Sequence, residues 1–264
     1  MAKAQTVTQG HIDALNTALF GENPPSEFLL KQWERDARAL IRKGGNEAAD
    51  GYQLLGVLAV FNNDVEQIDA NFQKAMRLDP GTALIAENYA TALLATLHSR
   101  RACQRVLDFG LDRLLRQGGD ASKALAVLLS VCGHVGKALE LIGDTGEPME
   151  TSQTTTAEIS IQWIACAHAE LQEVGLNDDA LACWIDCAET VLREKLPETG
   201  CKPWQLRAEY LYMEEFGCAI DYHAPVTAGQ ALELNLAIFA AQARLDYPTV
   251  LSFPTISVVP HRAG

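Results

Sequence analysis

Residues 51–80 read GYQLLGVLAVFNNDVEQIDANFQKAMRLDP and contain two helical patterns joined by a turn. Apolar and small residues recur at helical spacing in both halves, as Tyr52, Leu55, Gly56 and Ala59 in the first and Ile68, Phe72, Ala75 and Met76 in the second. Between the halves, Asn62-Asn63-Asp64 has the chemistry of a turn followed by a helix N-cap, and Asp79-Pro80 ends the second pattern. The stretch therefore predicts a helix-turn-helix hairpin of about 34 residues, a length typical of helical repeats.

The hairpin resembles a tetratricopeptide unit at its signature positions. These are Tyr52 at the large aromatic position of the first helix, Leu55-Gly56 at its Leu-Gly pair, Phe72 and Ala75 in the second helix, and Pro80 at the end. Ala59 and Ile68 depart from the family pattern, which has an aromatic residue at the first position and a small alanine at the second. The resemblance implies a right-handed array of helical hairpins whose first helices line a concave, peptide-binding groove.

The pattern continues on both sides of this hairpin with fewer signature residues, so we expect a mainly α-helical chain. Asn88-Tyr89-Ala90 repeats part of the signature one unit later, and a third unit begins at Asp120. The expected parts are an N-terminal capping helical hairpin over 1–45, tetratricopeptide-like repeats over 46–143, a linker with a divergent helical hairpin over 144–199, and a small α+β region over 200–264.

Helix ends inside these parts follow from capping chemistry. In the capping hairpin, one helix is expected over 9–20 and a second between Ser26 and Gly44-Gly45. In the divergent hairpin, Asn177 is expected to cap the second helix and Pro197 to end it.

Residues 200–264 change character, because β-branched and aromatic residues become frequent. Strands are expected over 207–213, 218–223 and 250–259, and a strongly apolar helix over 228–245. The order strand, strand, helix, strand predicts a small α+β region.

The chain of 264 residues carries a formal net charge of −13, which is unevenly distributed. Residues 1–143 hold 15 Lys and Arg against 16 Asp and Glu, whereas residues 144–264 hold 6 against 18. An acidic half repels phosphate backbones and anionic lipids and attracts basic surfaces, so a nucleic-acid binder is not expected and a basic partner is favoured.

The seven cysteines form no CxxC pair, and most lie within helical apolar stripes. Buried free thiols in a reducing cytoplasm are the expectation, with no metal site and no cofactor. The N-terminus lacks the apolar core of a signal peptide, and no apolar run reaches the roughly 18 residues of a membrane helix. We therefore expect a cytoplasmic protein with no membrane association.

Catalytic fingerprints such as GxGxxG, GxxxxGK[ST], HExxH and GxSxG are missing from the sequence, so no catalytic residues are assigned. The densest polar cluster of the C-terminal region is Asp221-Tyr222-His223, which follows Glu214-Glu215. Alternation along a half-buried strand also produces such clusters. An enzyme that uses Asp221 and His223 with one of the two glutamates is therefore an alternative and not the main prediction.

The resemblance to tetratricopeptide arrays implies a partner-binding groove at matching positions. Its lining would be Gln53, Val57, Val60, Phe61, Glu87, Asn88, Thr91, Leu94, Lys123, Val127 and Ser130. This set is apolar with few charges, which favours the apolar face of a peptide. The alternative is that Val57, Val60 and Leu94 pack between helices.

We therefore expect a non-enzymatic protein–protein interaction module or scaffold, binding a partner protein or peptide through the groove and the acidic C-terminal half. A second possibility is a dedicated antitoxin, immunity protein or secretion chaperone for one basic partner. The charge asymmetry is the feature that favours it.

Overall fold

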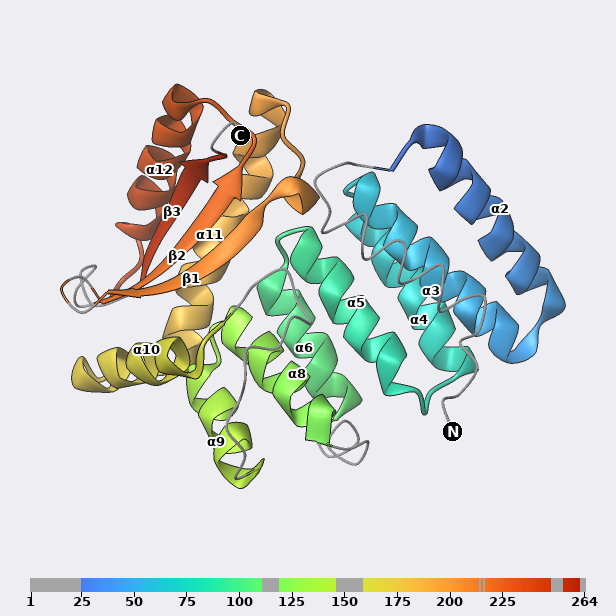
Figure 1. The fold of residues 1–264 in the computed structure, drawn as a ribbon, viewed down its shortest axis with the longest axis horizontal. Helices are drawn as coiled ribbons and strands as arrows, with labels where there is room; N and C mark the ends of the chain where they lie inside the picture. Colours follow the sequence, from blue (N-terminus) through green and yellow to red (C-terminus); the bar gives the residue numbers. More distant parts are fainter. Residues whose placement is uncertain are drawn as a thin grey trace. The chain divides into compact units, whose positions relative to one another are not determined.

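A computed structural model describes residues 25–110, 119–145, 159–213, 215, 217–247 and 254–261. The chain divides into two compact units, residues 1–96 (unit 1) and residues 97–264 (unit 2). In the described residues, ten α-helices and three strands make a mainly helical protein with a small three-stranded sheet towards the C-terminus (Figure 1). The helix expected over 9–20 and most of the linker expected after residue 143 lie outside the described residues.

The described part of unit 1 is helical throughout (Figure 1). Its helices are α2 (Glu27–Lys43), α3 (Gly45–Phe61), α4 (Val65–Leu78) and α5 (Ala83–Ala95). The predicted caps are confirmed, because the Ser26 hydroxyl accepts from the Leu29 amide at 3.3 Å and the Asp64 carboxylate accepts from the Gln67 amide at 3.0 Å. Gly44 ends α2 with φ +81°, a conformation that side-chain-bearing residues rarely adopt.

The core of unit 1 is built around Phe72 of α4, which is fully buried. Its ring stacks on Tyr89 of α5, with ring centroids 4.9 Å apart and planes 7° from parallel. Against α3 the ring meets Gly56, where an added Cβ would stand 2.5 Å from the ring carbons. Glycine at position 56 thus lets α3 and α4 approach closely, which accounts for the small residue at this position of the hairpin.

The described part of unit 2 combines two helical hairpins with a small α/β layer (Figure 1). Its elements are α6 (Ser99–Phe109), α8 (Gly119–Val131), α9 (Val135–Thr145), α10 (Ile161–Glu173), α11 (Asp178–Thr199), a 3-10 turn η1 (Pro203–Gln205), β1 (Arg207–Met213), β2 (Gly217–Ala224), α12 (Ala228–Gln242) and β3 (Thr255–Pro260). Asn177 caps α11 as predicted, accepting from the Ala180 amide at 3.1 Å. The prediction that Pro197 ends this helix is wrong, since α11 continues to Thr199 and stops at Gly200 with φ +80°.

The strands predicted over 207–213 and 218–223 are confirmed as β1 and β2. Of the strand predicted over 250–259, residues 250–253 lie outside the described residues, and β3 begins at Thr255. β1 and β2 are antiparallel, with Tyr210 opposite Ile220, and β2 and β3 are parallel, with Ile220 beside Ile256. Tyr210, Ile220 and Ile256 are buried, whereas the opposite face carries polar side chains such as Glu209 and His223 among apolar ones. The sheet therefore has one largely buried apolar face for the core of unit 2 and one mixed face.

Two tryptophans join the helices of unit 2 to its sheet. Trp163 of α10 donates from Nε1 to the Ala219 carbonyl at 3.2 Å and meets the Tyr210 ring edge-on at 4.9 Å between centroids. Trp184 of α11 donates from Nε1 to the Pro254 carbonyl at 3.2 Å. The C-terminal region is therefore part of the same core as α10 and α11.

Candidate functional site

The groove residues inferred from the tetratricopeptide resemblance are mostly enclosed by their own units. Seven of the eleven are buried, namely Gln53, Val57, Val60, Phe61, Asn88, Val127 and Ser130. Glu87, Thr91 and Leu94 are half-buried, and the side chain of Lys123 lies outside the described part of the chain. Burial raises the pKa of the Glu87 carboxyl above its ordinary value.

Hydrogen bonding and packing within the helices explain this burial. Asn88 of α5 donates from Nδ2 to Oε1 of Gln53 on α3 at 3.0 Å, so these two amides satisfy each other inside unit 1. Ser130 donates to the Ala126 carbonyl one turn earlier in α8. Side chains used in this way offer almost no surface to a peptide. The buried valines match the packing alternative that the sequence left open.

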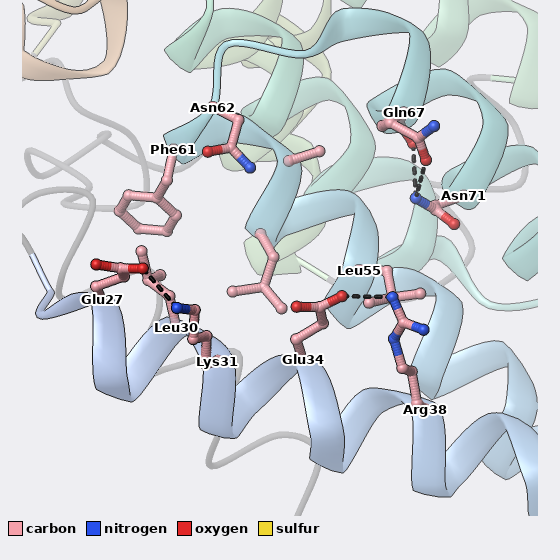
Figure 2. A pocket seen from close by; sticks show the side chains of 12 residues that line it. Glu27, Leu30, Lys31, Glu34, Arg38, Leu55, Phe61, Asn62, Gln67 and Asn71 are labelled. Carbon is pink, nitrogen blue, oxygen red and sulfur yellow. Dashed lines mark hydrogen bonds and ion pairs between the residues drawn. The ribbon is translucent and has the colours of Figure 1, made fainter.

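An open groove does exist in unit 1, along α2 and the hairpin of α3 and α4 (Figure 2). It encloses about 380 Å³. Its floor is apolar and comes from Leu30, Leu55, Leu58, Ala59 and Phe61, and its rim is polar and comes from Glu27, Lys31, Glu34, Arg38, Asn62, Gln67 and Asn71. We call this set the α2 groove.

The α2 groove forms because α2 buries only a narrow stripe. Trp33 and Ala37 are buried, while Leu30 on the adjoining face is half-buried and lines the groove. From α3, Leu55 and Leu58 lie three residues apart, so they project on the same side of the helix and are also half-buried. Three partly exposed leucines therefore converge on one depression.

Charges on the rim of the α2 groove are paired along α2 itself. Glu27 meets Lys31 and Glu34 meets Arg38, each pair at 2.6 Å and one helical turn apart (Figure 2). The hydrogen bond from Lys31 lowers the pKa of the Glu27 carboxyl, and the same contact raises the pKa of Lys31. Two cations offset two anions, so the rim presents no excess of charge and the leucines dominate what the groove can bind.

Asp221 and His223 lie two residues apart in β2 and therefore on the same face of the sheet, where each has a partner from a neighbouring strand. His223 Nε2 lies 2.8 Å from Glu209 of β1, and Asp221 instead accepts from the Ser257 hydroxyl of β3. Glu214 lies outside the described residues, and Glu215 is exposed. Glu209 has 54% of its side chain exposed, so the His223–Glu209 pair lies on the solvent side of the sheet and not in an enclosed site.

The most enclosed carboxyl of unit 2 is Glu189 of α11, which is only 2% exposed. It accepts from the Ser99 amide at 2.9 Å and from the Ser99 hydroxyl, and so satisfies the first turn of α6. Burial raises its pKa to about 7, opposed by the Ser99 hydrogen bonds and by Arg193.

This carboxyl gives unit 2 a pH-dependent stability. An unfolded glutamate has a pKa of about 4.3, so between about pH 4.3 and pH 7 the folded chain holds a proton that the unfolded chain has lost. Stability should therefore fall by roughly 4 kcal/mol as the pH rises through this window and level off above it. We expect Glu189→Gln to flatten this slope in urea titrations at several pH values. Parallel profiles of the variant and the wild type would contradict this.

Two further properties concern only the described residues. They contain no group of three or more His, Cys, Asp or Glu side chains placed to hold a metal ion. None of the described helices combines the length and apolar character needed to cross a membrane.

Comparison with protein-family models, curated proteins and solved structures gave no match for this chain. Any functional conclusion therefore depends on the residues and their geometry.

Proposed function

We propose that this protein is a non-enzymatic protein-interaction module whose α2 groove binds an amphipathic helix of a partner protein. The observation that carries the proposal is the convergence of Leu30, Leu55 and Leu58, all partly exposed, on one depression of about 380 Å³. A volume of this size accommodates a few apolar side chains, which is how helix-in-groove recognition works.

The scaffold is proposed to be a tetratricopeptide-like array of helical hairpins. The contact of Phe72 with Gly56 and its stacking on Tyr89 support this, because these residues stand at signature positions and connect three successive helices. Phe61 belongs both to the lining inferred from the resemblance and to the α2 groove. The other inferred residues do not line this groove, and Leu30, Leu55 and Leu58 form its apolar surface with Phe61.

The chemistry of the α2 groove favours a particular kind of helix. Because the rim charges are already paired, the partner needs no net charge, and its contacts should be apolar residues spaced at i, i+3 or i+4, and i+7. The exposed amides of Asn62 and Gln67 can hydrogen-bond polar groups at the edge of such a helix. Binding should accordingly depend little on salt.

The acidic surplus of residues 144–264 supports a second, weaker candidate, a dedicated neutraliser or chaperone for one basic protein. Such a complex would weaken steeply with salt and would not depend on the α2 groove. A reducing, cytoplasmic location is proposed for either function. It is supported by the free thiols of the chain.

Selection of helical peptides on the full-length chain tests the proposal. Peptides selected from a random library should carry the apolar spacing above, and Leu58→Glu should weaken them at least about tenfold, a loss of about 1.4 kcal/mol. The matched control is Leu78→Glu, which alters an exposed leucine of α4 that does not line the groove. Peptides that bind both variants equally, or that are lost only when salt is raised, would refute the α2 groove as the binding site.

A further inference from the structure

One end of the α2 groove lies at the N-terminal end of α2. Ser26 caps this helix, and Glu27, its first residue, already stands on the rim of the groove (Figure 2). Along α2 the lining runs from Glu27 to Arg38, which is about 16 Å at 1.5 Å per helical residue. A segment of chain that directly precedes Ser26 is therefore tethered to one end of the groove.

α2 has room for a neighbour on the side of the groove. Among the described helices it packs mainly against α3, and α4 lines the groove only through Gln67 and Asn71. Leu30 of α2 and Leu55 and Leu58 of α3 are half-buried as a result. Covering these leucines removes apolar surface from water, which favours any helix with an apolar face that lies over them.

The sequence just before α2 has the apolar spacing that the α2 groove favours. Residues 9–20, QGHIDALNTALF, lie outside the described residues, and their sequence places Ile12, Leu15 and Leu19 at i, i+3 and i+7. In a helix this spacing puts three side chains on one face. Asp13 is the only Asp, Glu, Lys or Arg of the segment, which suits a groove whose rim charges are already paired.

The connection between this segment and α2 has a suitable length. Residues 21–25, GENPP, leave six Cα–Cα steps between Phe20 and Ser26, which span at most about 22 Å. Consecutive helices joined by so few residues commonly form an antiparallel hairpin. As a helix, residues 9–20 would be about 16 Å long, equal to the lining along α2. The segment can therefore lie along the whole groove.

We propose that residues 9–20 of the chain itself form an amphipathic helix that occupies the α2 groove and leaves it when a partner helix binds. The inference rests on the proposed function, since it assigns an internal competitor to the same site. The face of the segment defined by Ile12, Leu15 and Leu19 covers the three half-buried leucines of the groove.

The tether gives the internal helix an advantage over a free partner. A ligand joined to its site by a short connection acts at an effective concentration in the millimolar range, so weak contacts are enough to keep the groove occupied. A groove that is open for about one-tenth of the time binds its partner about tenfold more weakly than one that is always open. The segment thereby excludes helices of low affinity from the groove.

Photo-crosslinking within the full-length chain tests the occupancy without any partner. The photoreactive residue p-benzoylphenylalanine replaces Leu15, and the irradiated protein is digested with trypsin. Cleavage after Lys3, Lys31, Lys43 and Lys74 leaves position 15 in peptide 4–31, and Leu55 and Leu58 in peptide 44–74. We expect these two peptides to be linked, with a yield that does not change when the protein is diluted.

The matched control carries the same photoreactive residue at Thr17. This position is two residues beyond Leu15, about 200° further round a helix, and should give at most one-fifth of the yield. Equal yields at the two positions, no link to peptide 44–74, or a link that disappears on dilution would overturn the proposal. The last result would assign the contact to a second copy of the chain.

Peptide affinity gives a second criterion on the full-length chain. For a helical peptide whose binding depends on Leu58, the double change Leu15→Glu and Leu19→Glu should raise the affinity about tenfold. Thr17→Glu should leave the affinity unchanged. Equal affinity for the wild type and the double variant would refute the internal competitor while the proposed function stands. If no peptide depends on Leu58, the proposed function fails, and the cross-link from position 15 still decides whether the segment occupies the groove.

Discussion

Deletion of residues 201–264 is expected to unfold the helices of unit 2 that the structure describes, while unit 1 stays folded. The deletion removes the whole sheet and α12, which cover Trp163 and Trp184. These two tryptophans are 0% and 3% exposed in the intact chain, and fully burying an aromatic side chain is worth about 1.5–3 kcal/mol. Gln242 of α12 also donates to the Trp184 carbonyl at 3.3 Å.

The loss should exceed the stability of a typical domain, about 5–15 kcal/mol, because an entire face of the core of unit 2 is removed. Tryptophan fluorescence measures it best in a Trp33→Phe background, where the truncated chain keeps only Trp163 and Trp184. Emission should shift to the red, and trypsin should cut within 97–200 faster than within 25–96. A cooperative urea transition with unshifted emission would show instead that the C-terminal region is a separate domain.

Helix ends could be predicted from the sequence because they depend on local chemistry. Ser26, Asp64 and Asn177 cap their helices as expected, since a short polar side chain before an apolar run bonds its own helix in almost any context. At Pro197 local chemistry is not sufficient, because α11 continues two residues beyond this proline. The loss of one amide in the last turn of a long helix is tolerated when the rest of the helix is packed.

The buried side of a helix could be predicted less well. α3 packs against α2, α4 and α5, and Leu54, Val57 and Val60 are all buried, so its apolar residues surround the helix and no period distinguishes a groove face from a packing face. In α2, Trp33 and Ala37 are buried, but the equally apolar Phe28 is 72% exposed. In α12, Leu234 and Ile238 face the core but Leu232, Leu236 and Phe239 do not.

The α2 groove could not be found from sequence patterns because packing brings its residues together. Leu30 comes from α2 and Leu58 from α3, and Leu55 also stands at a position of the repeat signature.

Replacement of Phe72 by alanine is expected to destabilise unit 1 by about 3–5 kcal/mol. The ring is fully buried, stacks on Tyr89 and fills the space over Gly56, so its removal leaves a cavity among α3, α4 and α5. Hydrogen–deuterium exchange over α3–α5 in increasing urea measures the free energy of opening of unit 1 by itself. Phe28→Ala is the matched control in the same unit and should change stability by less than about 0.5 kcal/mol, because Phe28 is exposed.

A substitution at Gly56 tests whether positions 56 and 72 pack against each other, as the proposed alignment of the two helices of the hairpin requires. In the wild type, Gly56→Ala places a Cβ 2.5 Å from the Phe72 ring and should cost about 1–3 kcal/mol through overpacking. In the Phe72→Ala background that clash is gone, and alanine in a helix interior is favoured over glycine by about 1 kcal/mol, so the same change should become neutral or stabilising. This reversal of sign would show that positions 56 and 72 are packing partners. Additive effects, or a loss below about 1 kcal/mol for Phe72→Ala, would instead remove the packing argument for a tetratricopeptide-like hairpin.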